Sequence, residues 1–400
     1  MKKILAILFF FGCAVGAYFF GVEKAFVNPY PAVCNLVAQK IFLEDEPVKK
    51  WHRICLRRQR LVTPYSPRKL VIKDINNVLG LLNVSHLEVF DSAAVKSIWV
   101  GESKETGLET DFVDSELVVF KIHPKSPAEK AGFKKGDVIT TINGEQPNPW
   151  EAQSVAGVYI VQRHQEKIPI KIKTETIQRF EQITFSNFNK DVVIHIPSFQ
   201  ARFFSDEKLQ EISEKMAGAR RVVVDLRGNS GGNFVAGLRF LSTMICKPSE
   251  VGRLVRTRAE KKTSLEMPDD LRDEKQIEVL NSHYEVLLKT FPQKSCYRGE
   301  LRVLVDGKSA SVAEMVGQAL KEFRQAKLLG NVSRGQLLVG VWYPLDEVGP
   351  GVQISIPEAY YISAQKHRIE GHGVDLDKVL YYDLDELQAG QDTWIKKALD

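Results

Sequence analysis

The sequence predicts a multidomain α/β protein whose largest part is a layered core of strands and helices. Two segments carry this prediction: Arg221–Phe234 (RVVVDLRGNSGGNF) and Arg302–Phe323 (RVLVDGKSASVAEMVGQALKEF). Each begins with a short β-branched run typical of a buried strand, breaks into small residues and continues in a helical pattern. The length of 400 residues exceeds one ordinary core. Because strands alternate with helices from about residue 190 to 385, we expect the core there.

The first 22 residues predict a signal peptide or a membrane anchor. Lys2 and Lys3 precede Ile4–Val22, an uncharged apolar stretch of 19 residues. The apolar part of a signal peptide has about 7–15 residues and a spanning helix about 17–25, so this stretch lies between the two. Phe10–Cys13 (FFGC) faintly resembles a lipoprotein cleavage box and ranks third. In each case the rest of the chain would be extracytoplasmic, in a bacterial periplasm, either soluble or anchored to the inner membrane.

Residues 23–97 are expected to form a helical N-terminal region, interrupted by prolines, in which Leu70–Val84 has helical periodicity. Lys49–Arg60 is the densest basic cluster, which we interpret as a solvated face or a patch beside anionic lipid. The chain carries 55 basic and 50 acidic residues, well interspersed, so nucleic-acid binding has little support.

Residues 100–180 are expected to form a second, smaller domain. The predicted elements are a strand (Glu116–His123), a short helix (Ala128–Ala131), a strand (Val138–Asn143), a helix (Trp150–Arg163) and a strand (Ile168–Thr174). Within the core, Arg256–Glu278 is polar and charged, which predicts an exposed loop or short helix that could act as a lid. Residues 386–400 are expected to form a C-terminal tail.

Four cysteines beyond residue 22 suit an oxidising compartment: Cys34, Cys55, Cys246 and Cys296. Four cysteines allow three connectivities. We favour Cys34–Cys55 and Cys246–Cys296 because each pair falls within one proposed domain; free buried thiols are the alternative. The absence of a CxxC pair from the sequence argues against zinc-ribbon and thioredoxin-like chemistry.

The second domain resembles a PDZ domain over Val118–Gly144 (VVFKIHPKSPAEKAGFKKGDVITTING). The resemblance implies that a peptide C-terminus binds as an added strand, with its carboxylate on backbone N–H groups. Gly107 and Leu108, in the stretch Gly107–Thr110, would then form the carboxylate loop. The alternative is a PDZ-shaped spacer without a ligand.

A PDZ-like unit followed by VVVDLRGNSGG and GKSASVAE resembles the carboxyl-terminal processing (tail-specific) protease family over roughly residues 75–385. The resemblance implies a crotonase-like α/β core with an inserted PDZ domain and a helical N-terminal region. It also implies that the nucleophile is the second serine of Ser309-Ala-Ser311, here Ser311. The alternative reading is that Ser311 caps the helix in a capping box with Glu314.

The expected base departs from the common pattern of the family. Most members place a lysine 25 residues after the nucleophile, and that position here is Gln336. A minority branch, including tricorn-like proteases, uses Ser–His–Glu. The segments VSHLEVF and IEGHGVD match that branch and supply His86 and Glu370. His372 is the second choice for the base, whereas His195 reads as a packed strand residue.

In this interpretation the oxyanion is bound by the N–H of Val312 and by an N–H of the Gly231–Gly232 turn. Arg227 would touch substrate or order that turn. Gly228-Asn-Ser230-Gly-Gly also matches the G-x-S-x-G nucleophile elbow, which makes Ser230 a competing nucleophile.

The sequence therefore predicts an exported serine endopeptidase that recognises protein C-terminal tails and needs no metal or other cofactor. The alternative is a catalytically inactive PDZ scaffold or adaptor, because Gln336 replaces the usual lysine.

Overall fold

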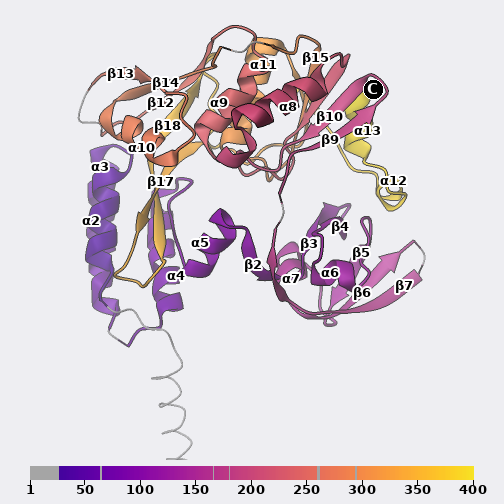
Figure 1. Ribbon diagram of the computed structural model, residues 1–400. Helices are drawn as coiled ribbons and strands as arrows, with labels where there is room; N and C mark the ends of the chain where they lie inside the picture. The colour runs from indigo at the N-terminus through magenta and orange to yellow at the C-terminus, as the bar shows by residue number, and fades with distance from the viewer. Residues whose placement is uncertain (1–26, 64, 165, 180, 259–261, 293–294) are drawn as a thin grey trace, which may run out of the picture. The chain divides into compact units, whose positions relative to one another are not determined.

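The computed structural model describes residues 27–63, 65–164, 166–179, 181–258, 262–292 and 295–400 (Figure 1). The predicted signal peptide or anchor, residues 1–22, lies outside these ranges. Within them, we find no helix that has both the length and the apolar character to cross a membrane. The chain divides into two compact units. The first comprises residues 1–95, 256–260 and 338–360, and the second comprises residues 96–255, 261–337 and 361–400.

The first unit is a group of helices packed on an antiparallel sheet. Its elements are α2 (Tyr30–Lys40), α3 (Asp45–Arg57), η1 (Arg58–Leu61), α4 (Arg68–Leu79), η2 (Gly80–Leu82), β1 (Glu88–Phe90), β17 (Leu338–Pro344) and most of β18 (Gln353–Ser363). α2 and α3 run side by side (Figure 1). β18 pairs antiparallel with both β1 and β17.

The N-terminal region therefore contains a hairpin from much later in the chain. Val352, Ile354 and Ile356 are buried in the same apolar cluster as Trp51 and Ile75. Burying this apolar face against the helices holds residues 338–360 in the first unit, although they follow the core strands in sequence.

Both predicted disulfides are confirmed. Cys34 in α2 bonds to Cys55 in α3, and Cys246 bonds to Cys296. Each bond joins residues within one unit. Two disulfides are typical of proteins that fold in an oxidising compartment.

Replacing Cys34 and Cys55 together by serine should lower the free energy of unfolding of the first unit by about 3 kcal/mol, because the bond closes a loop in the unfolded chain. The two cysteines are 21 residues apart. Urea denaturation followed by tryptophan fluorescence measures the change, and reductant should shift the wild-type curve in the same direction. An unchanged midpoint in both experiments would show that this bond contributes no stability.

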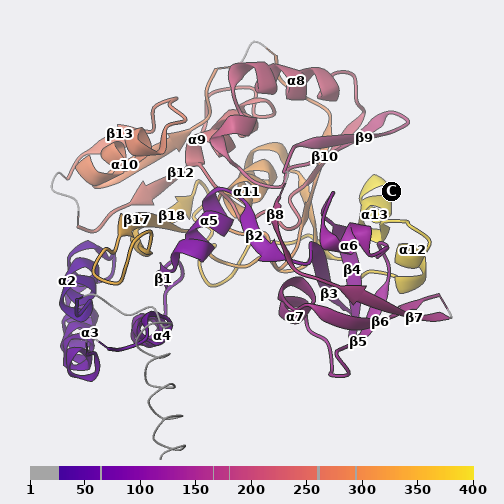
Figure 2. The same cartoon turned by 60° about the horizontal axis from the view of Figure 1, so that its bottom comes forward.

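The second unit begins with the PDZ-like domain, a five-stranded antiparallel sheet in the order β3-β4-β5-β6-β7 (Figure 2). Its elements are β3 (Leu108–Val113), β4 (Glu116–Ile122), α6 (Pro127–Lys130), β5 (Val138–Ile142), α7 (Pro149–Ser154), β6 (Gly157–Arg163) and β7 (Glu166–Ile172). β2 (Glu102–Glu105) pairs with β8 (Glu175–Gln178), and α5 (Ser92–Trp99) precedes them.

The prediction of one helix over Trp150–Arg163 is wrong beyond Ser154. The chain continues as β6, in which Tyr159 and Val161 are buried, whereas their neighbours Val158, Ile160 and Gln162 are more exposed. This period of two suits a strand with one face on the core.

The core of the second unit is a six-stranded sheet in the order β19-β16-β15-β11-β10-β9. The strands are β9 (Thr184–Phe188), β10 (Asp191–His195), β11 (Arg221–Asp225), β15 (Glu300–Val305), β16 (Lys327–Gly330) and β19 (Lys378–Val379). All neighbouring strands are parallel except β9, which pairs antiparallel with β10. The helical elements are η3 (Ala201–Phe203), α8 (Asp206–Met216), α9 (Phe234–Ser242) and α11 (Val312–Arg324).

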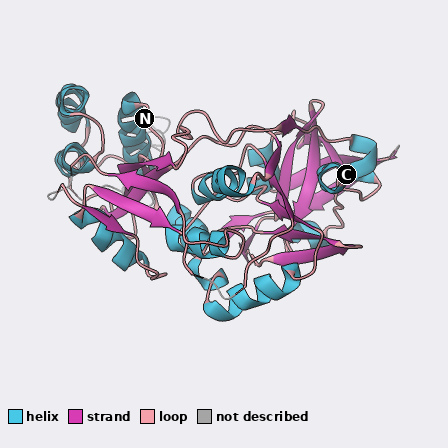
Figure 3. Cartoon of the chain, turned by 90° about the horizontal axis from the view of Figure 1, so that it is seen from above, coloured by secondary structure: helices cyan, strands magenta, loops and turns pink. Residues whose placement is uncertain are grey.

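Two further parts complete this unit. β12 (Glu250–Val255), β14 (Glu285–Lys289) and β13 (Ser264–Glu266) pair in that order, with α10 (Asp273–Ser282) beside them. The stretch expected to be a loop or short helix thus holds a strand and part of a helix. The expected tail forms α12 (Leu384–Gln388) and α13 (Thr393–Leu399). Trp394 and Ala398 of α13 are buried against the core strands. Figure 3 shows the C-terminal helix beside these strands.

Candidate active site

Ser311 occupies a strained turn between β15 and α11. It is the residue immediately before the helix, with φ +57° and ψ −124°, a region that costs an L residue free energy and that clusters at functional sites. Ser230 has no positive φ, and α9 begins only at Phe234, after Asn233 as its N-cap. The backbone form of a nucleophile turn therefore occurs at Ser311 and not at the competing serine.

The buried carboxylate of Glu314 holds this turn against the loop after β16. Its Oε2 accepts the N–H of Ser311 at 2.9 Å and that of Gln336 at 3.0 Å. Its Oε1 accepts the hydroxyl of Ser333 at 2.6 Å and the N–H of Gly335 at 2.7 Å. The side chain has no solvent exposure, and this burial raises the pKa of Glu314 although all four donors oppose the shift.

The capping-box alternative for Ser311 describes only part of these contacts. The backbone N–H of Glu314 approaches the Ser311 side chain in a capping box, but its hydrogen bond of 2.9 Å goes to the Ser311 carbonyl oxygen. A hydroxyl that accepts a contact from the helix keeps its own proton. Capping and nucleophilic attack by Ser311 are therefore compatible.

The glycine turn after β11 contacts Ser311 directly. A Cβ added to Gly231 would lie 2.6 Å from the Ser311 Cβ and 3.0 Å from the Val312 nitrogen. The N–H of Gly231 donates to the Asn229 side chain at 2.8 Å. The N–H of Val312, at the first position of α11, lacks an intrahelical acceptor. The N–H of Gly231 is therefore already engaged, which leaves Val312 and Gly232 as the remaining candidates among the three predicted oxyanion donors.

Gln336, which lies 25 positions after Ser311 in the sequence, is beside it in the structure. The Ser311 N–H donates to the Gln336 carbonyl oxygen at 3.0 Å as well as to Glu314. The backbone of residue 336 contacts Ser311, so a basic side chain at that position would lie close to the serine. Gln336 occupies that place and cannot accept a proton at neutral pH.

Glu370 lies on a loop that pairs with the same segment. Its Oε2 accepts the N–H of Leu337 at 2.8 Å, and Gly371 donates to the Gly335 carbonyl oxygen at 2.8 Å. The segment Gly335–Leu337 thus connects the two sites: Gln336 contacts Ser311, and Leu337 contacts Glu370. His372 is exposed, and its Nδ1 lies 3.1 Å from the carbonyl oxygen of Glu370.

His86 belongs to the first unit, so its approach to Ser311 stays a prediction. Its backbone has φ +60°, its Nδ1 lies 2.8 Å from the Ser85 hydroxyl oxygen, and its Cβ would be 3.2 Å from a Cβ added to Gly340. The Ser85 hydroxyl and the close approach of Gly340 in β17 therefore limit the positions open to the His86 ring.

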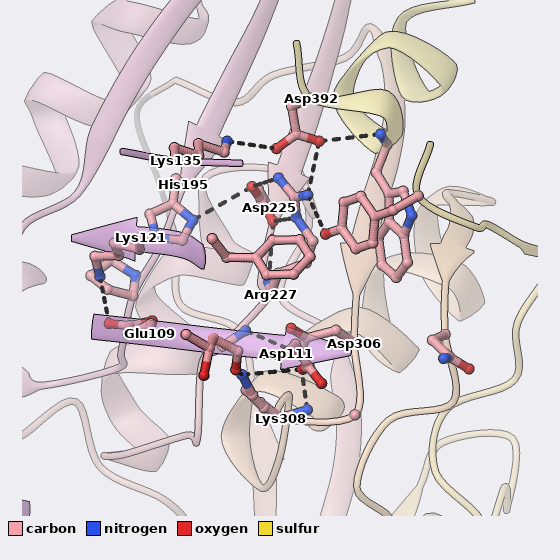
Figure 4. A pocket seen from close by; sticks show the side chains of 18 of the residues that line it. Glu109, Asp111, Lys121, Lys135, His195, Asp225, Arg227, Asp306, Lys308 and Asp392 are labelled. Carbon is pink, nitrogen blue, oxygen red and sulfur yellow. Dashed lines mark hydrogen bonds and ion pairs between the residues drawn. The ribbon is translucent and has the colours of Figure 1, made fainter. Parts of the chain in front are cut away.

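A cavity of about 1040 Å³ in the second unit joins the PDZ-like domain to the core (Figure 4). Its PDZ side is β3 with Trp150 and Gln153 of α7, and its core side includes Gly228, Ser230 and Lys308. Gly107 directly precedes β3, the edge strand of its sheet, and allows an approach to Ser126 that a Cβ would block. Leu108 is buried, and its N–H donates to the Thr106 hydroxyl at 3.3 Å.

Lys308 lines this cavity on the core side and contacts the strand on the PDZ side. Its Nζ lies 3.2 Å from Asp111 and donates to the Thr110 carbonyl oxygen at 3.3 Å, both on β3 (Figure 4). This contact could not be predicted from the sequence. Only folding brings residues 198 positions apart into contact, and a lone lysine in a turn gives no signal of it.

Arg227, which directly precedes the glycine turn, makes four polar contacts through its guanidinium group. Nε and Nη2 donate to Asp225 at 2.8 and 2.6 Å, and Nη1 donates to the Tyr382 hydroxyl at 2.9 Å and to Asp392 at 3.0 Å. Burial alone would lower the pKa of Arg227, but attraction to Asp225 raises it. His195, on β10, lies 3.5 Å from Asp225 (Figure 4).

Comparison with known proteins agrees with this architecture. Residues 192–380 match the model of peptidase family S41, and residues 118–174 match that of a PDZ domain. A "probable CtpA-like serine protease" of Staphylococcus aureus (strain bovine RF122 / ET3-1) is 25% identical over 325 residues, which cover 78% of this chain and 60% of that protein. The protein of the same name from Staphylococcus epidermidis is 24% identical over 327 residues, covering 78% and 61%. The chain thus spans about 60% of the length of these relatives.

Solved structures show the same fold at low identity. The photosystem II D1 C-terminal processing protease has a TM-score of 0.55 at 18% identity, covering 91% of this chain and 97% of its own. Mature CPAF complexed with lactacystin has a TM-score of 0.61 at 12% identity, covering 93% and 97%. The sequence likeness to peptidase family S41 thus covers residues 192–380 and that to a PDZ domain covers residues 118–174, while the solved structures show that the fold is shared.

Proposed function

We propose that the chain is an exported serine endopeptidase that cleaves peptide bonds by acyl transfer, with Ser311 as nucleophile, His86 as base and Glu370 orienting the imidazole. The observation that carries the proposal is the strained Ser311, held against Gly231 beside a residue 336 that is not lysine. The family match and the relatives named as serine proteases support the reaction class.

In the proposed reaction His86 takes the hydroxyl proton as Ser311 Oγ bonds to the scissile carbonyl carbon. The oxyanion that forms accepts hydrogen bonds from the N–H groups of Val312 and Gly232. The intermediate collapses as His86 returns the proton to the leaving amine. Water then attacks the acyl-enzyme, with His86 as base again, and releases the carboxylic acid and free Ser311. Protein groups alone perform this chemistry.

The PDZ domain would select the substrate by its C-terminal tail. β3 is an edge strand with α7 beside it, the arrangement in which a peptide adds as a further strand. Gly107 and Leu108, at the start of this strand, would face the terminal carboxylate. Arg227 is proposed to order the turn behind the site, since Asp225, Tyr382 and Asp392 already engage its guanidinium.

Replacing Lys308 by alanine should tighten the binding of a C-terminal peptide about three- to tenfold, because Lys308 occupies a β3 carbonyl oxygen that an added strand needs. Fluorescence anisotropy of a labelled tail peptide measures the change in Kd, and Lys308→Arg, which keeps the cation, should stay within about twofold of wild type. Weaker binding by Lys308→Ala would show that the lysine contacts the peptide instead of competing with it.

Export is supported by the two disulfides and by the apolar stretch before residue 23. We propose an extracytoplasmic location, the bacterial periplasm, with Ile4–Val22 retained as an inner-membrane anchor. Gln336 favours one rival, a PDZ scaffold with an inactive core. Hydrolysis of a denatured protein with an unstructured tail decides between the two, since a scaffold would bind the tail without cleaving it.

A further inference from the structure

The first unit carries a local excess of positive charge that the proposed peptidase activity does not use. Residues 47–73 contain nine basic and no acidic residues, whereas the whole chain is nearly balanced at 55 to 50. The nine are Lys49, Lys50, Arg53, Arg57, Arg58, Arg60, Arg68, Lys69 and Lys73. Such an excess of positive charge creates a positive electrostatic potential at the surface of a folded domain, and this potential attracts an anionic partner.

The helix α3 sorts these charges to one side. Val48, Trp51 and Cys55 are buried against the rest of the unit. At about 100° per residue, Lys49, Lys50, Arg53 and Arg57 lie together on the opposite side, and all four are exposed. We call Lys49, Lys50, Arg53, Arg57 and Arg60 the basic face.

Few of the charges on the basic face are neutralised within the described part of the chain. Lys49 pairs with Glu46 at 3.2 Å, and Arg58, outside the basic face, pairs with Asp74. Arg53, Arg57 and Arg60 have no acidic partner among the described residues. Two apolar side chains, Ile54 and Leu61, stand exposed beside them at 39% and 62%. Basic and apolar side chains mixed in this way are typical of surfaces that contact lipid headgroups.

A second observation limits the distance between the basic face and the apolar stretch Ile4–Val22. The Asn28 side chain donates to the Gln59 carbonyl oxygen at 2.7 Å, which ties the start of the first unit to η1. The apolar stretch ends at Val22, and six residues can span at most about 20 Å. Gln59, between Arg57 and Arg60, must therefore lie within about that distance of the end of Ile4–Val22.

From these observations we infer that the basic face binds the anionic headgroups of the bilayer that holds Ile4–Val22. The inference rests on the membrane anchor in the proposed function. Counterions screen such attraction beyond about 8–10 Å at ordinary ionic strength, so the basic face must come close to the headgroups, and a tether of at most about 20 Å allows that approach. An anchor and a basic face together fix the orientation of the first unit on the membrane, which an anchor alone would leave free.

Lysine footprinting of the full chain in lipid nanodiscs tests the inference. Discs of phosphatidylcholine alone are compared with discs containing about one third phosphatidylglycerol, a fraction that gives a strongly negative surface. A water-soluble acylating reagent should label Lys49 and Lys50 at least about threefold more slowly on the anionic discs, because bound headgroups cover their amines. Lys190 and Lys215, exposed in the second unit, should label equally on both and serve as internal controls.

Two variants with equal change in net charge sharpen the test. Arg53→Gln/Arg57→Gln/Arg60→Gln should abolish the difference between the discs, and Lys167→Gln/Lys171→Gln/Lys247→Gln, three exposed lysines of the second unit, should keep it. About 0.5 M salt should also remove the difference in wild type. Equal labelling of Lys49 and Lys50 on both discs would overturn the inference. A chain that is held on neither disc would refute the anchor instead, and hydrolysis measured in solution remains a separate test of the peptidase.

Discussion

Replacing Ser311 by alanine should lower peptide hydrolysis on the order of 10⁴-fold or more while the protein stays folded. The loss corresponds to at least about 5 kcal/mol of transition-state stabilisation. The backbone contacts of residue 311 with Glu314 and Gln336 do not involve its side chain. Alanine keeps them and bears the same strain at φ +57°. Cleavage of a denatured, tailed protein, followed by gel and mass spectrometry, measures the loss, and circular dichroism checks the fold.

Three further variants separate the competing assignments. Ser230→Ala should retain wild-type hydrolysis, since its backbone lacks the form of a nucleophile turn. His86→Ala should lose nearly as much as Ser311→Ala because nucleophile and base act as a unit, and Glu370→Gln should lose less. Full activity of Ser311→Ala would remove the nucleophile. Activity of His86→Ala equal to wild type would remove the triad but leave the peptidase.

The local features of the fold could be predicted because short stretches determine them. The strand-turn-helix segments around Arg221 and Arg302 have the expected strands, and the disulfides pair as neighbours. Cys34 and Cys55 lie on packed helices, α2 and α3, so proximity in sequence and in space coincide. The PDZ-like domain also keeps its glycines where the chain turns, at Gly132, Gly136 and Gly144.

What could not be predicted depends on contacts between distant residues. Residues 338–360 join the first unit because Ile354 and Ile356 pack against its helices, and periodicity cannot say which apolar surface a hairpin will cover. The same limit applies to Lys308, which reaches β3 of the PDZ domain. Tyr159 and Val161 point into a core that only the assembled sheet provides, so the helix predicted there was wrong.

Replacing Glu314 by glutamine should cause the largest loss of activity outside the proposed triad. The carboxylate accepts hydrogen bonds from Ser311, Ser333, Gly335 and Gln336. In glutamine an NH₂ group replaces one carboxylate oxygen. It cannot accept a hydrogen bond, so two of the four donors lose their acceptor, and each buried donor left unpaired costs about 1–3 kcal/mol. We therefore expect unfolding free energy to fall by about 2–5 kcal/mol. Hydrolysis should fall by at least about 10²-fold, because Ser311 would no longer be held.

The rate of labelling by a small serine-reactive fluorophosphonate separates lost positioning from lost substrate binding. Glu314→Gln should slow the labelling of Ser311 and lower kcat with little change in tail-peptide affinity. Glu211→Gln, an exposed carboxylate on α8 paired with Lys208, is the matched control and should change neither quantity. Wild-type labelling of Ser311 in Glu314→Gln would show that the carboxylate does not position the nucleophile.

The pH dependence of stability gives an independent check on Glu314. Burial raises its pKa in the folded state above the ordinary value of 4.5, so the protonated form is favoured by folding. The stability that this group contributes is then fully present below pH 4.5 and is lost as pH rises through the raised folded-state pKa. Glutamine does not titrate, so the stability advantage of wild type over Glu314→Gln should shrink from pH 4 towards pH 8. Urea denaturation at several pH values measures this difference, and an advantage that grows with pH would mean that the four donors outweigh burial.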